Sequence, residues 1–303
     1  QVAAIKAKDC SRGKDIADIL SGLSDEMGVP AQIVSDAGSN IKAGIKAFRG
    51  AVKKEDPTAK VISTYDITHK AGILIKHLLK DDSDWKDFTR KLADTKRNVI
   101  YTEFVSYAPN RPKDKARWLN LEERVTWAEK ILAISSARSR RAGEKATEDR
   151  RFDEHFGWVK AHKRNIVLWR AYLEILSIAK KEIKHNGLSK QTPAIVAKQL
   201  RRVKSKRKEV TDLKTRMISF LREETADFAD SEEWLGTSDI IESVFGKYKV
   251  FSARTPLKEI GKSILTIPVF TSPVSLPDVR EAMETISDKM LRKWLAENIG
   301  ESL

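Results

Sequence analysis

Two acidic residues, Asp36 and Glu242, have the type and setting that metal-assisted phosphodiester chemistry requires. Asp36 closes a short apolar run, residues 31–36, and a glycine-containing helix start at 37–40 follows it. Glu242 lies in a second compact apolar segment, residues 238–249. Carboxylate oxygens that converge from separate elements can hold divalent metal ions, which activate a nucleophile and stabilise a leaving oxygen. The pair therefore suggests an enzyme that acts on nucleic acid.

Each carboxylate also has an ordinary structural interpretation. Asp36 could be a turn or helix N-cap aspartate, and Glu242 could be a glutamate on an exposed helix face. The position of Asp36 suits a metal site, because ligands of open α/β sheets gather beyond the carboxyl ends of the strands. Taken alone, each residue leaves both interpretations open.

The composition predicts a folded, basic protein with a polyanionic partner. The chain has 303 residues, of which 41% are hydrophobic, and this is enough for a buried core. The formal net charge of +14 is typical of proteins that bind nucleic acid. The single cysteine, Cys10, excludes an intramolecular disulfide and a thiolate zinc cluster. Because we find no signal peptide and no bilayer-spanning apolar run, we expect a cytoplasmic (nucleoid) location in a bacterium and a nuclear one in a eukaryote.

Alternating strand and helix patterns predict an α/β layer at the start of the chain. Strands are expected at residues 1–8, 31–35 and 60–67, and the last of these is rich in β-branched residues. Helices are expected after each strand: at 14–27, from Ser39 or Asn40 onward, and through 73–79. This order of elements favours a partly parallel sheet.

A change of composition near Lys80 predicts a separate helical domain. From there to about Asp230 the chain is charged, helical in period and poor in strand signals, and it holds five of the seven tryptophans. We therefore predict a first core part at 1–80, a helical insertion domain at 81–232, and a last core part with C-terminal helices at 233–303. The final segment, 277–298, has the pattern of one amphipathic helix.

Three short motifs resemble those of DDE transposases. The order of elements, with residues 35–40 (SDAGSN) after a strand, resembles their RNase H-like catalytic core. Residues 66–69 (DITH) are similar to the [Cys/Asp]-x-x-His signature of hAT and related transposases. Glu242 is followed seven residues later by Lys249, as in the Tyr-Arg-Glu-Lys signature of some bacterial insertion-sequence transposases, although Leu235 and Ser238 replace its Tyr and Arg. The resemblance covers about residues 1–80 and 234–265.

The resemblance implies an α/β fold: an RNase H-like mixed sheet with flanking helices, interrupted by a large all-α insertion domain. Asp36 and Glu242 would be the second and third catalytic carboxylates of a site for two Mg²⁺ (or Mn²⁺) ions. The first catalytic Asp would belong to a strand upstream of Gln1, while Asp9 is interpreted as a turn residue. A chain that begins at Gln1 is therefore expected to be inactive by itself. The implied activity is Mg²⁺-dependent DNA cleavage and strand transfer at transposon ends, by a homodimer or higher assembly on DNA.

Further residues are candidates for contact with DNA. Lys249 would contact DNA near the carboxylates, and His69 would lie near the core or be an ordinary helix-start histidine bonded to the backbone. Trp118 is the candidate for stacking on a base, whereas Trp158 and Trp169 are interpreted as core. The main candidates for phosphate contact form one basic cluster: Arg201, Arg202, Lys204, Lys206, Arg207 and Lys208. A second basic run lies at 138–141, and a solvated helix face is the alternative interpretation of both.

Three functions are compared on these grounds. The first is the catalytic domain of a DDE transposase. The second is a catalytically inactive, transposase-derived protein that binds DNA through residues 198–208 in a salt-dependent manner and without cleavage. The third is a general RNase H-like nuclease, and the long helical insertion argues against it.

Overall fold

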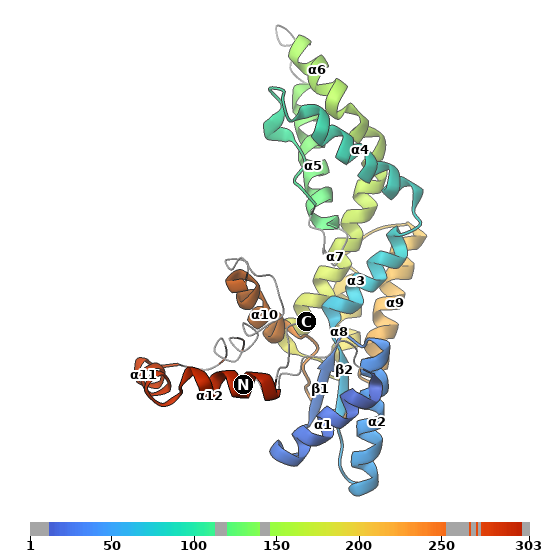
Figure 1. The fold of residues 1–303 in the computed structure, drawn as a ribbon. Helices are drawn as coiled ribbons and strands as arrows, with labels where there is room; N and C mark the ends of the chain where they lie inside the picture. The colour runs from blue at the N-terminus through green and yellow to red at the C-terminus, as the bar shows by residue number, and fades with distance from the viewer. Residues whose placement is uncertain are drawn as a thin grey trace. The chain divides into compact units, whose positions relative to one another are not determined.

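The chain folds into two compact units that consist mainly of helices (Figure 1). The fold is seen in a computed structural model that describes residues 12–112, 120–139, 146–252, 267, 271 and 274–298. The first unit combines residues 1–64 with 237–303, and the second comprises 65–236. The functional division at residues 80 and 232 remains a prediction, because contacts alone do not define functional domains.

The first unit contains the sheet. Helix α2 connects strands β1 and β2, which run parallel, and the backbone N–H of Ile62 donates to the carbonyl of Ala31 at 2.9 Å. The side chain of Gln32 adds a 2.7 Å hydrogen bond to the hydroxyl of Thr64. The elements are α1 (Gly13–Met27), β1 (Gln32–Ser35), α2 (Ser39–Glu55), β2 (Ile62–Tyr65), α10 (Asp239–Ser252), α11 (Leu276–Thr285) and α12 (Asp288–Asn298).

Helices α1 and α2 pack closely because glycine lies at their contact. A Cβ atom at Gly44 would lie 2.6 Å from the Cβ of Ile16 and 2.7 Å from the carbonyl oxygen of Gly13. Real Cβ atoms do not approach other atoms so closely, so the contact requires glycine at this position. The apolar cluster of the unit has Phe48, Val52 and Val61 as its buried members.

The second unit is a helical assembly around one long helix. Helix α7 contacts α3, α5, α8 and α9. Within the described residues, no helix has the combination of length and apolar character that crossing a membrane requires. The elements are α3 (Ile67–Leu79), α4 (Ser83–Val99), η1 (Val105–Tyr107), α5 (Leu121–Arg138), α6 (Ala146–Phe156), η2 (Gly157–His162), α7 (Lys163–Asn186), α8 (Thr192–Leu200) and α9 (Lys208–Glu224).

Aromatic side chains form the core of this helical unit. The ring of Trp169, on α7, is fully buried, and its centroid lies 4.9 Å from those of both Trp85 and Phe88. The half-buried Trp158 lies 5.5 Å from Phe88, and its indole N–H donates to the hydroxyl of Thr95 at 2.9 Å. The interpretation of Trp158 and Trp169 as core residues is confirmed.

The predicted RNase H-like mixed sheet is wrong for this structure. The described residues are 72% helical, and their sheet has two parallel strands and no more. The strands predicted at 31–35 and 60–67 are confirmed in shorter form, while the one at 1–8 lies outside the described residues. The remaining described segments repeat their apolar residues at helical spacing, which favours helices over further strands.

The predicted single helix at 277–298 is also wrong, since two helices occupy this segment. Ile286 has φ −102° and ψ 106°, an extended conformation that ends α11. The hydroxyl of Ser287 then accepts a 3.3 Å hydrogen bond from the backbone N–H of Met290, at the start of α12. A β-branched residue followed by serine favours such a break, because serine caps a new helix.

The close contact of α1 and α2 predicts opposite effects of two alanine substitutions in α2. Gly44→Ala places a methyl group 2.6 Å from the Cβ of Ile16, and such overpacking costs on the order of 1–3 kcal/mol. Gly50→Ala, the matched control, meets nothing within 4 Å and is expected to gain about 0.5–1 kcal/mol. Urea unfolding of both variants measures the difference. Equal free energies of unfolding for the two variants would contradict the close contact of α1 and α2 at Gly44.

Candidate functional site

Asp36 lies at the turn between β1 and α2. Its side chain is exposed, and its Oδ1 accepts a 3.4 Å hydrogen bond from the backbone N–H of Gly38. Ala37, between them, has φ 52°, in the left-handed region that non-glycine residues rarely adopt. The carboxylate is therefore open to a ligand at the end of a parallel strand. The hydrogen bond to Gly38 is equally typical of an ordinary turn aspartate.

Glu242 lies in the first turn of α10 and belongs to the same unit as Asp36. Its side chain is half-buried, and its backbone N–H donates to the carbonyl of Ser238 at 3.1 Å. Lys249 is exposed in the last turn of the same helix. The partial positive charge of the helix N-terminus is complementary to the acidic side chain of Glu242.

The oxygens of Asp36 and Glu242 are of the kind that Mg²⁺ and Mn²⁺ prefer, and the exposed carboxylate of Asp36 can accept a metal ion. Across the described ranges, no three or more histidine, cysteine, aspartate or glutamate side chains gather as metal ligands would. Asp36 and Glu242 thus belong to one unit, and the described residues show no third ligand beside either carboxylate that would complete a metal site.

The motif at 66–69 has a clear local role as a helix start. Asp66 is the N-cap of α3: it is only 1% exposed, and its Oδ1 accepts a 2.8 Å hydrogen bond from the backbone N–H of His69. Three residues is the spacing at which an N-cap side chain reaches the third helical N–H. The half-buried ring of His69 lies 5.8 Å from that of Tyr65, whose backbone N–H donates to Glu224 at 2.7 Å. Asp66 thus fixes the backbone of His69 at the start of α3, and the ring of Tyr65 lies beside its imidazole.

The basic cluster predicted for phosphate contact occupies the turn between α8 and α9. Leu200 and Val203 are buried and anchor this turn, and the ammonium group of Lys214 donates to the carbonyl of Val203 at 2.5 Å. Arg207 pairs with Glu209 at 2.8 Å, and this hydrogen bond raises the pKa of the guanidinium and lowers that of the carboxyl. All six cations are exposed: Arg201, Arg202, Lys204, Lys206, Arg207 and Lys208. The segment, called the basic turn from here on, thus presents its charge from an anchored backbone.

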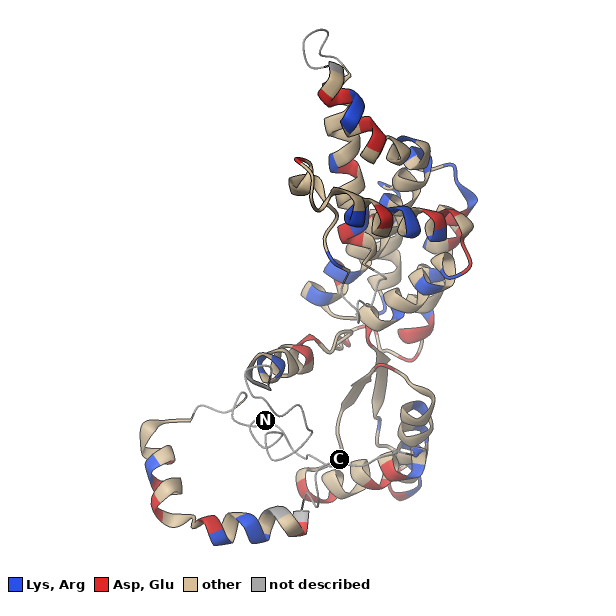
Figure 2. Cartoon of the chain, turned by 45° about the horizontal axis from the view of Figure 1, so that its top comes forward, with Lys and Arg blue, Asp and Glu red and all other residues tan. Residues whose placement is uncertain are grey.

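Charge elsewhere is mixed in sign. Figure 2 shows Lys and Arg spread over the helices together with Asp and Glu, so a basic surface has to be identified from particular residues. Arg138, in the second basic run, pairs with Glu148 at 3.0 Å and Asp149 at 2.9 Å and lies 4.6 Å from the centroid of Phe152. Its role is structural. The rest of that run at 140–141, and Trp118, lie outside the described residues.

The sequence patterns did not reveal a small pocket between α4 and α5. It has a volume of about 60 Å³, and Lys96, Arg111 and Arg124 line it together with Trp127. The only signal in the sequence was a loop pattern at 110–112, because the lining residues come from three separate segments.

The cap of α3 predicts that Asp66→Ala destabilises the protein by about 1–2 kcal/mol, since the His69 N–H loses its buried acceptor. Asp66→Asn is the matched control, because the amide oxygen can still accept and most of the stability is retained. Chemical unfolding followed by circular dichroism measures both. An alanine variant as stable as the asparagine variant would exclude the capping role.

Comparison of the chain with models of protein families, with curated proteins and with solved structures finds no match.

Proposed function

We propose that this chain is the DNA-processing part of a transposase, in which Asp36 and Glu242 supply carboxylates for Mg²⁺- or Mn²⁺-dependent cleavage and strand transfer at transposon ends. The observation that carries the proposal is the exposed carboxylate of Asp36 at the carboxyl end of β1, beside Ala37 in the left-handed conformation. Ligands collect at this edge of parallel sheets, and backbone outliers cluster at functional sites. The resemblance at 35–40, 66–69 and 242–249 supports the same function.

The two carboxylates have different settings that suit complementary roles in holding metal. Asp36 is exposed at a strand end, whereas Glu242 is half-buried in the first turn of a helix. A bound metal ion would activate water or a 3′-hydroxyl and stabilise negative charge on the transferred phosphoryl group. Lys249, exposed near the other end of α10, would contact a DNA phosphate.

The basic turn would supply affinity for DNA that does not depend on base sequence. Its six exposed cations can neutralise phosphates and release counterions, and this gives binding that weakens steeply with salt. Two transposon ends have to be paired for strand transfer, so we expect a homodimer or higher assembly on DNA.

A second function, a catalytically inactive transposase-derived protein that binds DNA, is favoured by one observation. The basic turn is fully formed within the second unit, and it needs neither carboxylate nor metal. Such a protein would bind DNA through the basic turn without cleaving it.

The basic turn predicts a change in the salt dependence of DNA binding. Replacing Lys204, Lys206 and Lys208 by glutamine removes up to three phosphate contacts, so the slope of log K against log salt should become less negative by about 2–3. The control replaces Lys46, Lys53 and Lys54, exposed on α2, and alters the net charge by the same amount. Fluorescence anisotropy with a DNA duplex measures both. Identical slopes in the two triple variants would argue against the basic turn as the contact.

The carboxylate pair predicts weaker metal binding in two variants. Asp36→Asn and Glu242→Gln each remove a ligand charge, and we expect the Mn²⁺ affinity, measured by electron paramagnetic resonance, to fall by about tenfold or more. Asp25→Asn is the control, because Asp25 is an exposed carboxylate of the same unit. Unchanged Mn²⁺ affinity in both variants, with DNA binding intact, would reject the catalytic proposal and favour the inactive DNA-binding protein.

A further inference from the structure

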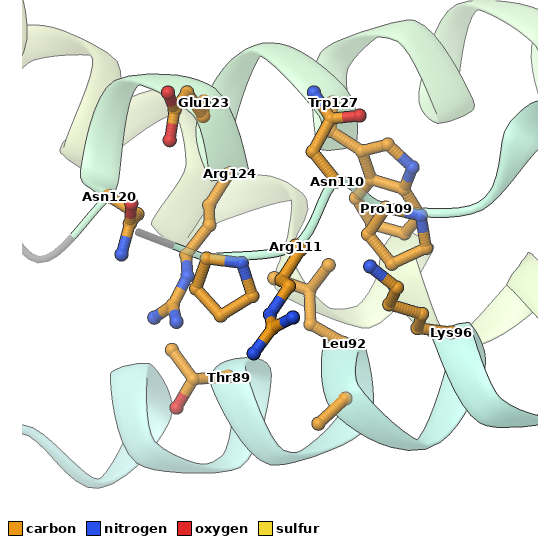
Figure 3. Close-up of a pocket in the computed structure, with 12 residues that line it drawn as sticks. Thr89, Leu92, Lys96, Pro109, Asn110, Arg111, Asn120, Glu123, Arg124 and Trp127 are labelled. Atoms are coloured by element: carbon orange, nitrogen blue, oxygen red, sulfur yellow. The ribbon is translucent and has the colours of Figure 1, made fainter. Parts of the chain in front are cut away.

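The pocket between α4 and α5 gathers three cations that the proposed function does not use (Figure 3). Lys96 comes from α4, Arg111 from the loop that follows η1, and Arg124 from the first turns of α5. Figure 3 shows the two guanidinium groups in the space between the helices, near Thr89. Among the lining residues that the structure describes, Lys96, Arg111 and Arg124 carry positive charge and Glu123 carries negative charge.

Within the described residues, ion pairs distinguish the cations of the pocket from their neighbours on α4. Arg90 pairs with Asp87 at 2.5 Å, and Arg97 pairs with Asp94. By contrast, the part of the chain that the structure describes gives Lys96, Arg111 and Arg124 no ion pair within 4.0 Å. These three cations are therefore candidates for contact with an anion from outside the chain.

Packing holds Arg124 at the pocket in a partly desolvated setting. Its guanidinium lies 5.4 Å from the ring centroid of Trp85, within the range of a cation–π contact. Burial lowers the pKa of Arg124, while the nearby Glu123 carboxylate acts in the opposite direction. The guanidinium stays protonated at neutral pH, and its attraction for an anion is stronger in a partly buried site than in bulk water.

The walls of the pocket set the size of its ligand. Trp127 is fixed by the hydrogen bond of its indole N–H to the carbonyl of Tyr107 at 2.9 Å. Pro109 and Leu92 complete the apolar part of the lining. One water molecule takes up about 30 Å³ in the liquid, so a volume of about 60 Å³ corresponds to roughly two waters. This space accommodates a phosphate group but not a nucleobase together with its sugar.

We propose that the pocket binds a single phosphate group, either free or part of a nucleic-acid backbone. Arg111 and Arg124 would donate through their planar guanidinium groups, whose geometry matches phosphate oxygens, and Lys96 would act as a point charge. The start of α5 lies at the same pocket, where Asn120 with φ 56° precedes the first helical residue and the helix dipole adds positive potential. The site uses neither Asp36 nor Glu242, so it goes beyond the proposed function. The phosphate site can be disproved while the proposed function stands.

The test uses the full chain and inorganic phosphate at constant ionic strength. Titration is followed by the NMR signal of the Trp127 indole N–H, which lies in the pocket wall. Arg111→Gln is the main variant, because Arg111 is exposed in the loop that follows η1. We expect phosphate affinity to fall about tenfold, and to fall further with Lys96→Met added. Arg97→Gln is the matched control: it removes the same charge one position from Lys96, outside the pocket.

A parallel titration with a short DNA duplex distinguishes the two sources of phosphate. A larger loss of DNA affinity in Arg111→Gln than in Arg97→Gln assigns the site to a nucleic-acid phosphate. A loss confined to the inorganic phosphate titration assigns it to free phosphate. Phosphate and DNA affinities that are the same in both variants, or that are undetectable in the unmodified chain, would overturn the proposal. The Mn²⁺ affinity of Asp36→Asn is independent of either outcome, so the two proposals are tested separately.

Discussion

Packing around helix α7 is the constraint on which the second unit depends. The fully buried ring of Trp169 lies against Trp85 and Phe88 of α4, and α7 also contacts α3, α5, α8 and α9. Aromatic rings bury more apolar surface than other side chains and prefer the tilted and edge-on arrangements found here. Helices α4 and α5 form the walls of the proposed phosphate pocket, and α8 and α9 flank the basic turn. Because these helices pack around α7, this core sets the positions of the cations.

Ion pairs on the helix surfaces accommodate many of the surface cations of the second unit. Most of those on α4 are neutralised locally, as in the pairs that Arg90 and Arg97 form with Asp87 and Asp94. Exposed pairs of this kind contribute little to stability, but they reduce repulsion between like charges. The cations for which we propose contact with phosphate are those of the basic turn, where Arg207 also pairs with Glu209, and those of the pocket, to which the described residues give no ion pair.

The first unit depends on a different constraint, the close approach of α1 and α2 at Gly44. The contact holds α2 so that its Phe48 and Val52 pack with Val61 in the apolar cluster, and α2 connects the two parallel strands. Asp36 lies at the junction of β1 and α2, so its position follows from the packing of the helix on the sheet. The left-handed conformation of Ala37 at this junction has an energetic cost, which the surrounding structure must offset.

Parts of the fold could be predicted because they depend on local patterns. The strands near 31–35 and 60–67 follow from short runs of apolar and β-branched residues, and α1 follows from apolar residues at helical spacing. The mixed sheet was wrong because it was implied by a resemblance in short motifs, and such motifs do not specify how many strands pair. One of those motifs, residues 66–69, forms the N-cap of α3, so helix capping explains the presence of Asp66 without any family resemblance.

The sequence alone determined the net charge, the order of the first helices and strands, the core tryptophans and the position of Asp36 after a strand. Only the tertiary structure decided that Lys96, Arg111 and Arg124 line one pocket, and that the two neighbouring arginines of α4 are paired instead. The physical reason is that periodicity reports which face of an element is buried but not which other element covers that face. The packing between helices decides which charges from separate segments come together, and local sequence patterns do not specify that packing.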